Sequence, residues 1–258
     1  MADALERSAG FFDSIRDAAL LRRWSRSSEE FAYGAPLITV DELQANALTP
    51  FPDREDVRWF LRQCDSDWAK GDMASPEDLI VWKSRQHFCS HAAHASHLWL
   101  AGFLPYKSIA YVAQEEQEGK DHLEERILGM WLRTPAWFRA MFKWEYKQAV
   151  GLFVIHEREG KPWRSYIEAI PRGSRKLRSW TYSRIHFDEA AHNDLLEASF
   201  TGAYATIRGG MRPDGSIKKG QMIFTSSAYF HPWLIDQTGA QFETALDMAR
   251  TDPIREAR

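Results

Sequence analysis

Apolar side chains recur every three or four residues through most of the chain, the spacing that places them on one face of an α-helix. This pattern predicts four long helices, over about residues 76–102, 106–132, 136–158 and 175–201. Ser75 followed by Pro76 is a typical start for the first of them. Because the connections between these helices are short, we expect them to form an antiparallel bundle.

The segments on either side of this bundle are expected to pack outside it or to be irregular. Residues 4–32 and 54–69 read as additional helices, whereas residues 202–225 contain several glycines and basic side chains and read as an irregular tail. The length of 258 residues is sufficient for one sizeable core. The sequence therefore predicts an all-α protein with a single domain over 1–258 and a bundle core at about 76–201.

Glu189 is the most informative polar residue of the last predicted helix, because its carboxylate would face the core. At about 100° per residue, several apolar side chains lie close to it on the helical wheel. These are Tyr182, Ile185, Leu196 and Phe200. A buried carboxylate is costly unless it is neutralised, and Glu189 with His192 matches the Glu-x-x-His device that binds metal in helical bundles. Asp188 would point about 100° away from Glu189 and lie behind the ligands or at the surface.

The other predicted helices also direct acids or imidazoles toward the core. Glu145 has apolar neighbours on the third helix, and one face of the second helix carries Glu115, Glu118 and His122. The first helix has a stripe of histidines instead of a glutamate: His87, His91, His94 and His97. Carboxylates and imidazoles on facing helices are the donors that two iron or manganese ions require. The competing interpretation is a polar core or a solvated helix face without metal.

Composition and charge narrow the class of protein further. A formal net charge of −3 and a pI near 6.3 argue against a nucleic-acid partner. The two cysteines, Cys64 and Cys89, form no metal-binding or disulfide pattern, which fits a reducing cytoplasm. No run of about eighteen apolar residues is present, so no membrane span is expected.

Three parts of the chain resemble ferritin-like di-iron carboxylate proteins. They are the E-x-x-E-x-x-x-H stretch from Glu115 to His122, the inward Glu145, and the D-E-A-A-H stretch at residues 188–192. The last stretch is similar to alternative oxidases and to phenylacetyl-coenzyme A epoxygenase subunits. The chain departs from the family pattern at Gly119, which stands where a glutamate normally precedes His122, and in its first helix, which offers histidines where a glutamate is normal.

Two further groups share parts of this pattern. Haem-oxygenase-like di-iron oxidases resemble the chain in a glutamate and a histidine seven residues apart, as Glu115 and His122 are, and in a final Glu189-x-x-His192. Residues 114–122 are similar to a stretch in bacterial proteins predicted to be metal-dependent hydrolases. All three resemblances imply a metal in a helical bundle.

The resemblance implies an oxygen-activating non-haem di-iron oxidoreductase, a monooxygenase or oxidase that acts on a small hydrophobic or aromatic substrate. We expect two iron ions, with manganese as the alternative metal, bound by Glu115, His122, Glu145, Glu189 and His192. Glu118 is an additional candidate ligand, and His94 or His97 would contribute from the first helix. O2 and an electron donor would be the partners, and homodimerisation is left open. A hydrolase on the same bundle, a non-catalytic iron- or haem-binding protein, and a metal-free interaction module are the alternatives.

Overall fold

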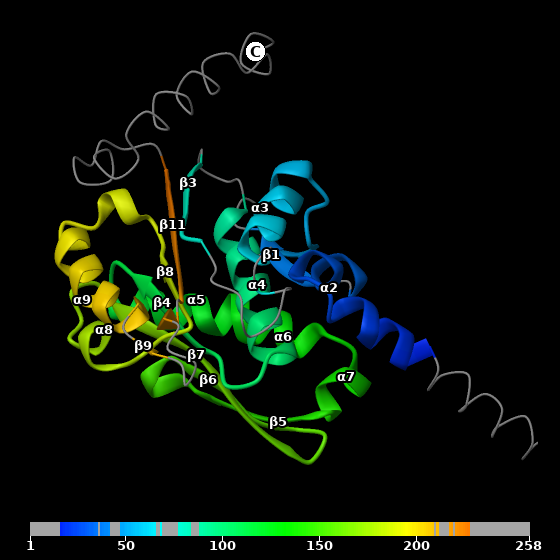
Figure 1. The fold of residues 1–258 in the computed structure, drawn as a ribbon. Coiled ribbons are helices and arrows are strands. Elements are labelled where there is room, and N and C mark those ends of the chain that lie inside the picture. Colours follow the sequence, from blue (N-terminus) through cyan, green and yellow to red (C-terminus); the bar gives the residue numbers. More distant parts are fainter. Residues whose placement is uncertain are drawn as a thin grey trace, which may run out of the picture.

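A seven-stranded mixed sheet forms the centre of the molecule in the computed structural model (Figure 1). The structure describes residues 16–35, 37–41, 47–65, 68, 77–83, 88–208, 210–211, 217–218 and 220–227. The strand order is β3-β11-β8-β4-β7-β6-β5. The five parallel strands are β3 (Leu79–Lys83), β11 (Gln221–Ser227), β8 (Arg184–Phe187), β4 (Ser108–Ala113) and β7 (Lys161–Pro171). The two antiparallel strands at one edge are β6 (Leu152–Arg158) and β5 (Phe142–Lys147).

Helices cover both faces of this sheet (Figure 1). The first face carries residues 16–24, α2 (Ser28–Gly34), α3 (Glu55–Asp65), α4 (Cys89–Phe103), α5 (Glu116–His122), the π-helix η3 (Leu123–Leu128), α6 (Gly129–Arg133) and α7 (Ala136–Ala140). The second face carries α8 (Lys176–Ser179) and α9 (Leu196–Arg208). Short 3-10 turns lie at η4 (Gln148–Val150) and η5 (Ala190–His192). Two small hairpins pair β1 (Ile38–Asp41) with β2 (Ala47–Pro50) and β9 (Gly210–Met211) with β10 (Ile217–Lys218).

The central strand β4 is apolar on both sides, because each side is covered by helices. In β4, Ile109 and Tyr111 belong to the hydrophobic cluster on the α4 face, and Ala110 and Val112 belong to the cluster on the α9 face. Successive side chains of a strand point to opposite faces, so a strand buried on both faces reads as one continuous apolar run. Such a run cannot be distinguished from a segment of buried helix by its periodicity alone.

The predicted all-α bundle is therefore wrong, and the protein is α/β. Each of the four predicted helices contains strand residues: the first contains β3, the second β4, the third β5 and β6, and the fourth β8. The predicted bundle core at about 76–201 is accordingly a sheet with flanking helices. No helix in the described part of the chain is long and apolar enough to cross a bilayer.

A buried arginine holds α4 against the sheet. The Arg184 side chain on β8 is fully buried, and its guanidinium donates to Ser96 Oγ on α4, to Gln221 Oε1 on β11 and to the Cys64 carbonyl of α3, each at 2.8 Å. The Asp65 carboxylate lies 4.0 Å away and accepts a 2.9 Å hydrogen bond from Ser96. A buried charge is tolerated when its donors are satisfied in this way. The same hydrogen bonds connect β8 to α3, α4 and β11 and fix the positions of these elements relative to one another.

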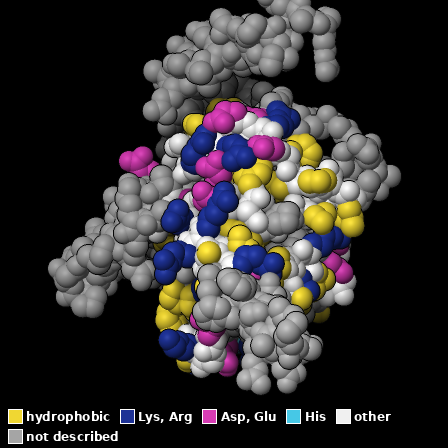
Figure 2. Space-filling model, turned by 90° about the vertical axis from the view of Figure 1, so that its right-hand side faces the viewer, with side chains coloured by type: hydrophobic (Ala, Val, Ile, Leu, Met, Phe, Trp, Pro, Cys, Tyr) yellow, Lys and Arg dark blue, Asp and Glu magenta, His cyan; other side chains and the backbone are white. Residues whose placement is uncertain are grey.

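The outer helices are held partly by ion pairs at the surface. Arg58 on α3 pairs with Glu29 on α2 at 2.9 Å and with Asp53 at 2.7 Å. Figure 2 shows the side of the molecule that lies on the right in Figure 1, where basic and acidic side chains are interspersed. Surface pairs of this kind contribute little stability each, so this part of the fold depends mainly on its aromatic core.

The order of the strands creates a switch point in the sheet. β4 and β8 are neighbours in the sheet. After β4 the chain continues to strands on the β7 side, whereas after β8 it continues to β11 on the other side. In open α/β sheets, ligands bind outside the carboxyl ends of the strands at such a point. This edge of the sheet is therefore where a functional site is expected.

A substitution at Gly220, the residue before β11, tests how closely the chain approaches the backbone of Tyr182 and Ser183 there. A Cβ at this position would lie 2.8 Å from the backbone carbonyl oxygens of both Tyr182 and Ser183. We expect Gly220→Ala to lower the free energy of unfolding by about 1–3 kcal/mol, because backbone atoms cannot move aside cheaply. Gly102→Ala is the matched control, since nothing lies within 4 Å of a Cβ there and the change should be neutral or slightly stabilising. Urea unfolding of both variants measures the difference.

Candidate functional site

The carboxyl ends of three parallel strands meet the first turn of a helix at one edge of the sheet. β3 ends at Lys83, β8 at Phe187 and β11 at Ser227, and α4 begins at Cys89. The two residues after β8, Asp188 and Glu189, carry the carboxylates of this edge. We call this group of strand ends and carboxylates the Asp188 edge.

Asp188 is bonded to side chains from three different elements. Its Oδ1 accepts hydrogen bonds from Ser90 Oγ on α4 at 3.0 Å and from Thr225 Oγ1 on β11 at 2.8 Å. Its Oδ2 accepts a 2.9 Å hydrogen bond from the Tyr111 hydroxyl on β4. The side chain is almost wholly buried, and these three hydroxyl donors replace the water that it has lost.

The electrostatic surroundings keep Asp188 ionised despite its burial. Burial acts to raise the pKa of this carboxyl. The positive charges of Lys83 and Arg126, together with the hydrogen bond from Thr225, outweigh burial and hold the pKa well below its usual value. The Asp188 edge therefore presents a fixed negative charge at neutral pH.

Glu189 forms a second, more exposed group. Its backbone lies in the left-handed region at φ 45, which strains a residue other than glycine and turns the chain sharply away from β8. Its Oε1 lies 2.6 Å from Lys83 Nζ, and its Oε2 accepts hydrogen bonds from the Ser227 backbone N–H at 3.0 Å and from Ser227 Oγ at 2.9 Å. The side chain is 31% exposed, compared with 10% for Lys83. Partial burial raises the pKa of Glu189, but the hydrogen bonds from Lys83 and Ser227 bring it below the usual value.

A chain of histidines approaches Asp188 from inside the protein. His97 Nε2 lies 3.2 Å from His186 Nδ1, and His186 Nε2 lies 2.9 Å from Thr225 Oγ1. Thr225 has one hydroxyl proton, and the bond to Asp188 uses it, so His186 must donate from Nε2. His186 Nδ1 is then an acceptor, and His97 must donate to it. The hydrogen-bond order is satisfied with both histidines neutral.

His122 completes the surroundings of Asp188 on the other side. Its Nδ1 lies 2.6 Å from the Tyr111 hydroxyl, and since that hydroxyl donates to Asp188, His122 must donate to Tyr111. His94 packs against Tyr111 with ring centroids 4.7 Å apart, and neither of its ring nitrogens has a hydrogen-bond partner among the described residues. Of the histidine stripe of the sequence, His91, His94 and His97 are buried on α4, whereas His87 lies outside the described residues.

The structure separates the seven predicted metal ligands into two groups. Glu145 lies on the edge strand β5, where it is exposed and contacts His156 Nε2 at 3.2 Å. Glu115 is at the N-terminus of α5 and faces Arg172 at 3.6 Å, and the Glu118 carboxylate accepts a hydrogen bond from the Glu115 backbone. These three glutamates are surface groups whose partners are cations or backbone.

The other four predicted residues lie around the Asp188 edge. They are His94, His122, Glu189 and His192. His192 contacts Ser227 Oγ at 3.2 Å, the same hydroxyl that donates to Glu189. In the part of the chain that the structure describes, no group of three or more histidine, cysteine, aspartate or glutamate side chains is arranged to hold a metal ion. The predicted di-iron or di-manganese cofactor is wrong.

Sequence reasoning missed the residues that form the centre of this site. The helical wheel predicts Asp188 behind the ligands or at the surface, whereas the structure buries it against Ser90 and Thr225. Lys83, which contacts Glu189, carries no local signal that would identify it. The available signal was the alternation of polar and apolar residues at 184–187, Arg-Ile-His-Phe, followed by two acids. Such alternation indicates a strand, and ligands of α/β sheets bind at the carboxyl ends of the strands.

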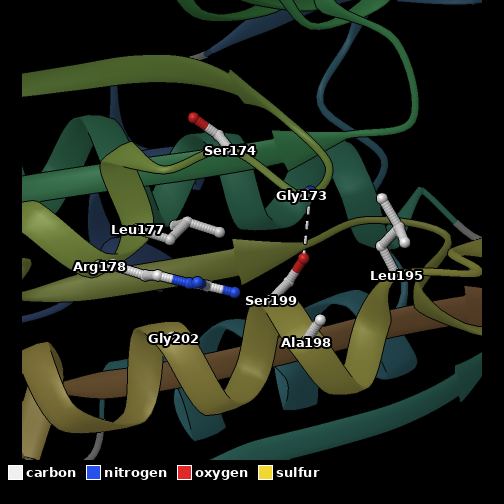
Figure 3. A pocket seen from close by; sticks show the side chains of 8 residues that line it. All are labelled: Gly173, Ser174, Leu177, Arg178, Leu195, Ala198, Ser199 and Gly202. Carbon is white, nitrogen blue, oxygen red and sulfur yellow. Dashed lines mark hydrogen bonds between the residues drawn. The ribbon is translucent and has the colours of Figure 1, made fainter.

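A pocket of about 210 Å³ lies beside α8 and α9 (Figure 3), and none of the residues that line it belongs to the Asp188 edge. Gly173 donates a 3.1 Å hydrogen bond to Ser199 Oγ across it, and Arg178 and Leu195 form its walls. Its volume is below the range of about 300–1,000 Å³ usual for small-molecule sites. We assign no ligand to it.

The fold is similar to that of phage terminases. The HK97 bacteriophage large terminase aligns with a TM-score of 0.52 at 11% identity, over 75% of this chain and 38% of its own. The ATPase domain of the Thermus phage P74-26 large terminase aligns with a TM-score of 0.45 at 13% identity, over 66% of this chain and 67% of its own. The Phi-28 gp11 DNA packaging motor aligns with a TM-score of 0.34 at 11% identity, over 67% and 55%. No protein-family model and no curated protein matches the chain.

These findings correct the expected family and activity. The mixed sheet and the likeness to a large terminase rule out the ferritin-like and haem-oxygenase-like resemblances. The predicted oxygen-activating oxidoreductase, with O2 and an electron donor as partners, is wrong together with them. The alternatives of a hydrolase or an iron- or haem-binding protein on a helical bundle are wrong as well, because the fold is not a helical bundle. The expectation of no nucleic-acid partner is also contradicted, since the fold is similar to that of the HK97 bacteriophage large terminase.

The buried histidines predict that the protein loses stability in mild acid. Burial lowers the pKa of His91 to about 3 and the pKa values of His122 and His186 to about 4. The unfolded chain takes up protons below its ordinary histidine pKa of about 6.5, whereas the folded chain does not until about pH 4, so stability falls over this interval. We expect His186 alone to account for roughly 1–2 kcal/mol of the loss at pH 5.

Urea unfolding between pH 7.5 and 5 measures this slope. His186→Gln should be less stable at pH 7.5 but should lose less stability on acidification. The exposed His156→Gln variant is the control and should keep the slope of the parent protein. A flat profile for the parent protein would show that these imidazoles are not held neutral.

Proposed function

We propose that the chain binds a nucleoside triphosphate together with Mg²⁺ at the Asp188 edge and hydrolyses it, as the ATPase domain of a phage DNA-packaging protein. The observation that carries this proposal is the 3.0 Å hydrogen bond from Ser90 Oγ to Asp188 Oδ1. P-loop nucleoside triphosphatases hold Mg²⁺ between a serine or threonine at the start of the helix that follows the phosphate loop and an aspartate on another strand of the sheet. Here Ser90 is in the first turn of α4, after β3, and Asp188 follows β8.

The donors at this edge suit Mg²⁺. Mg²⁺ prefers oxygen ligands and is usually held by one or two carboxylates in addition to the phosphates of its substrate. Asp188 supplies an ionised carboxylate and Ser90 a hydroxyl, and Thr225 adds a second hydroxyl beside them. When bound, the ion neutralises charge on the β- and γ-phosphate oxygens.

Glu189 is suited to act on the attacking water. In the hydrolysis, the water oxygen forms a bond to the γ-phosphorus while the bond from that phosphorus to the bridging oxygen breaks, and the diphosphate leaves. Glu189 is ionised, partly exposed and next to Asp188, so its carboxylate can orient the water and accept its proton. The inner carboxylate, Asp188, remains ionised through its three hydroxyl donors.

The similar structures support DNA packaging as the process in which we propose that the chain acts, but they do not identify its partners or its location. The likeness to the HK97 large terminase supports the fold, and this chain spans 38% of that protein, so DNA and further domains as partners are part of the proposal. The cytoplasm is the proposed location, consistent with Cys64 and Cys89 being buried and free of disulfides.

Substitution of the two carboxylates separates binding from hydrolysis. We expect Glu189→Gln to lower the rate of phosphate release from ATP by about 10²- to 10⁴-fold while ATP still binds, because the base is lost and the Mg²⁺ donors remain. Asp188→Asn should remove the dependence of ATP binding on Mg²⁺. Phosphate release and isothermal titration calorimetry, with and without Mg²⁺, measure the two effects.

Glu145→Gln serves as the matched control, because Glu145 also contacts a basic side chain but lies on the edge strand β5. It should change neither measurement. Absence of Mg²⁺-dependent ATP binding by the folded parent chain would refute the proposed function.

A further inference from the structure

The two oxygens of the Asp188 carboxylate have different numbers of hydrogen-bond donors. Oδ1 accepts from Ser90 Oγ, from Thr225 Oγ1 and, at 3.1 Å, from the Glu189 backbone N–H. Among the residues that the structure describes, Oδ2 accepts from one donor, the Tyr111 hydroxyl at 2.9 Å. Each carboxylate oxygen offers about two acceptor sites, so Oδ2 is the oxygen with a site left for a cation or for water bound to a cation.

The Tyr111 hydroxyl lies between this oxygen and His122. Asp188 is ionised and can only accept, so the hydroxyl proton must point to Oδ2. The 2.6 Å contact to His122 Nδ1 then requires a proton on Nδ1. Burial is the main cause that lowers the pKa of His122, to about 4, so the ring is neutral at pH 7 and carries a single N–H. His122 therefore has one defined tautomer, with the proton on Nδ1 and none on Nε2.

The elements on either side of the sheet strand β4 fix the positions of these groups. Tyr111 is fully buried on β4 and pairs in register with His186 of β8. His122 is the last residue of α5, and the π-helix η3 starts at the next residue, Leu123. π-helical turns are rare and occur frequently at functional sites. The hydrogen bonds from His122 through Tyr111 therefore connect the helix after β4 to the carboxylate after β8.

We infer that Tyr111 and His122 are positioning residues for the divalent cation: Tyr111 holds the Asp188 carboxylate so that the open acceptor site of Oδ2 serves the cation, and His122 fixes the direction of the Tyr111 hydroxyl. This inference rests on the proposed function, because it assigns the groups that orient the Mg²⁺ donor. Groups that hydrogen-bond to a metal-binding carboxylate set its orientation, and their loss typically lowers metal affinity by about ten- to a hundredfold. A hydroxyl that accepts a hydrogen bond is also a stronger donor, so the two bonds reinforce each other.

The alternative is that the Tyr111 hydroxyl only satisfies a buried carboxylate and has no influence on the cation. Removal of the hydroxyl would then lower the stability of the fold and weaken nucleotide binding equally with and without Mg²⁺. In the positioning role, the loss is confined to the Mg²⁺-dependent part of binding, because the nucleotide itself is not a partner of Tyr111 or His122. The Mg²⁺ dependence of binding therefore distinguishes the two roles.

Binding of ribose-labelled fluorescent ATP to the full chain, measured over a range of Mg²⁺ concentrations and in EDTA, tests the role of Tyr111. We expect Tyr111→Phe to raise the Mg²⁺ concentration for half-maximal binding by about ten- to a hundredfold, with little change in EDTA. An equal loss of affinity in EDTA would overturn the inference. Tyr146→Phe is the matched control, because the Tyr146 hydroxyl also bonds to α5, at the Lys120 carbonyl, but comes from the edge strand β5. It should bind as the parent chain does.

Two variants of His122 separate its donor from its ring. His122→Asn places an amide N–H where Nδ1 stands and should keep the Mg²⁺ dependence of the parent chain. His122→Phe keeps a ring without a donor and should raise the Mg²⁺ requirement by about three- to tenfold. Circular dichroism and the urea midpoint establish that each variant is folded.

The tautomer of His122 provides a measurement that needs no nucleotide. Nitrogen-15 NMR of the side-chain imidazoles should find the His122 proton on Nδ1, and the signal is assigned by its absence from His122→Asn. In Tyr111→Phe the constraint on the ring is lifted, and a proton on Nε2 should appear. A proton on Nε2 in the parent chain would show that the hydroxyl of Tyr111 points to His122, and this result would overturn the inference.

The results distinguish this inference from the proposed function. If the parent chain binds ATP with Mg²⁺ and folded Tyr111→Phe has the same Mg²⁺ requirement, only this inference fails. If Tyr111→Phe does not fold, equal Mg²⁺ requirements in His122→Phe and His122→Asn overturn it. If the folded parent chain shows no Mg²⁺-dependent binding of ATP, the proposed function fails and this inference fails with it.

Discussion

Burial of the ionised Asp188 carboxylate is the constraint on which the arrangement of the site depends. A buried carboxylate without hydrogen-bond donors would be strongly destabilising. Its donors are Ser90, Thr225 and Tyr111, which belong to α4, β11 and β4, while Asp188 itself follows β8. Four segments distant in sequence must therefore meet with hydrogen-bond accuracy. The same geometry places a serine hydroxyl and a carboxylate where a divalent cation can bind both.

The polar interior beneath Asp188 extends this constraint through the α4 interface. Arg184 contacts His97, which donates to His186, and His186 donates to Thr225, whose hydroxyl is bonded to Asp188. Every member has a defined donor role, and a protonated imidazole would have no acceptor for its additional proton. The histidines are therefore part of the support for the carboxylate, and their neutral state links stability of the fold to pH.

The two carboxylates at this edge differ because their partners differ. Asp188 is held by hydroxyls that are themselves buried, so its environment is rigid. Glu189 is strained in its backbone, more exposed, and paired with Lys83. Strain and partial exposure at the second carboxylate, beside a satisfied first one, are typical of a site where one group binds and its neighbour reacts.

The sequence by itself indicated that His91, His94 and His97 face the interior, because they share one stripe of a helical pattern. It wrongly directed Glu115, Glu118 and Glu145 inward. It also predicted the helix found at Glu55–Asp65. It did not distinguish β4 from buried helix, since both faces of β4 are covered and its side chains are apolar on both. In β8, polar and apolar residues alternate, but the run is only four residues long. Only the tertiary structure decided that Asp188, and not Glu189, is the buried centre, because a strand and a sharp turn direct side chains differently from a helical wheel. Pairing of parallel strands from distant parts of the chain brought Lys83, Ser90 and Thr225 to that carboxylate, and no local pattern records such a pairing.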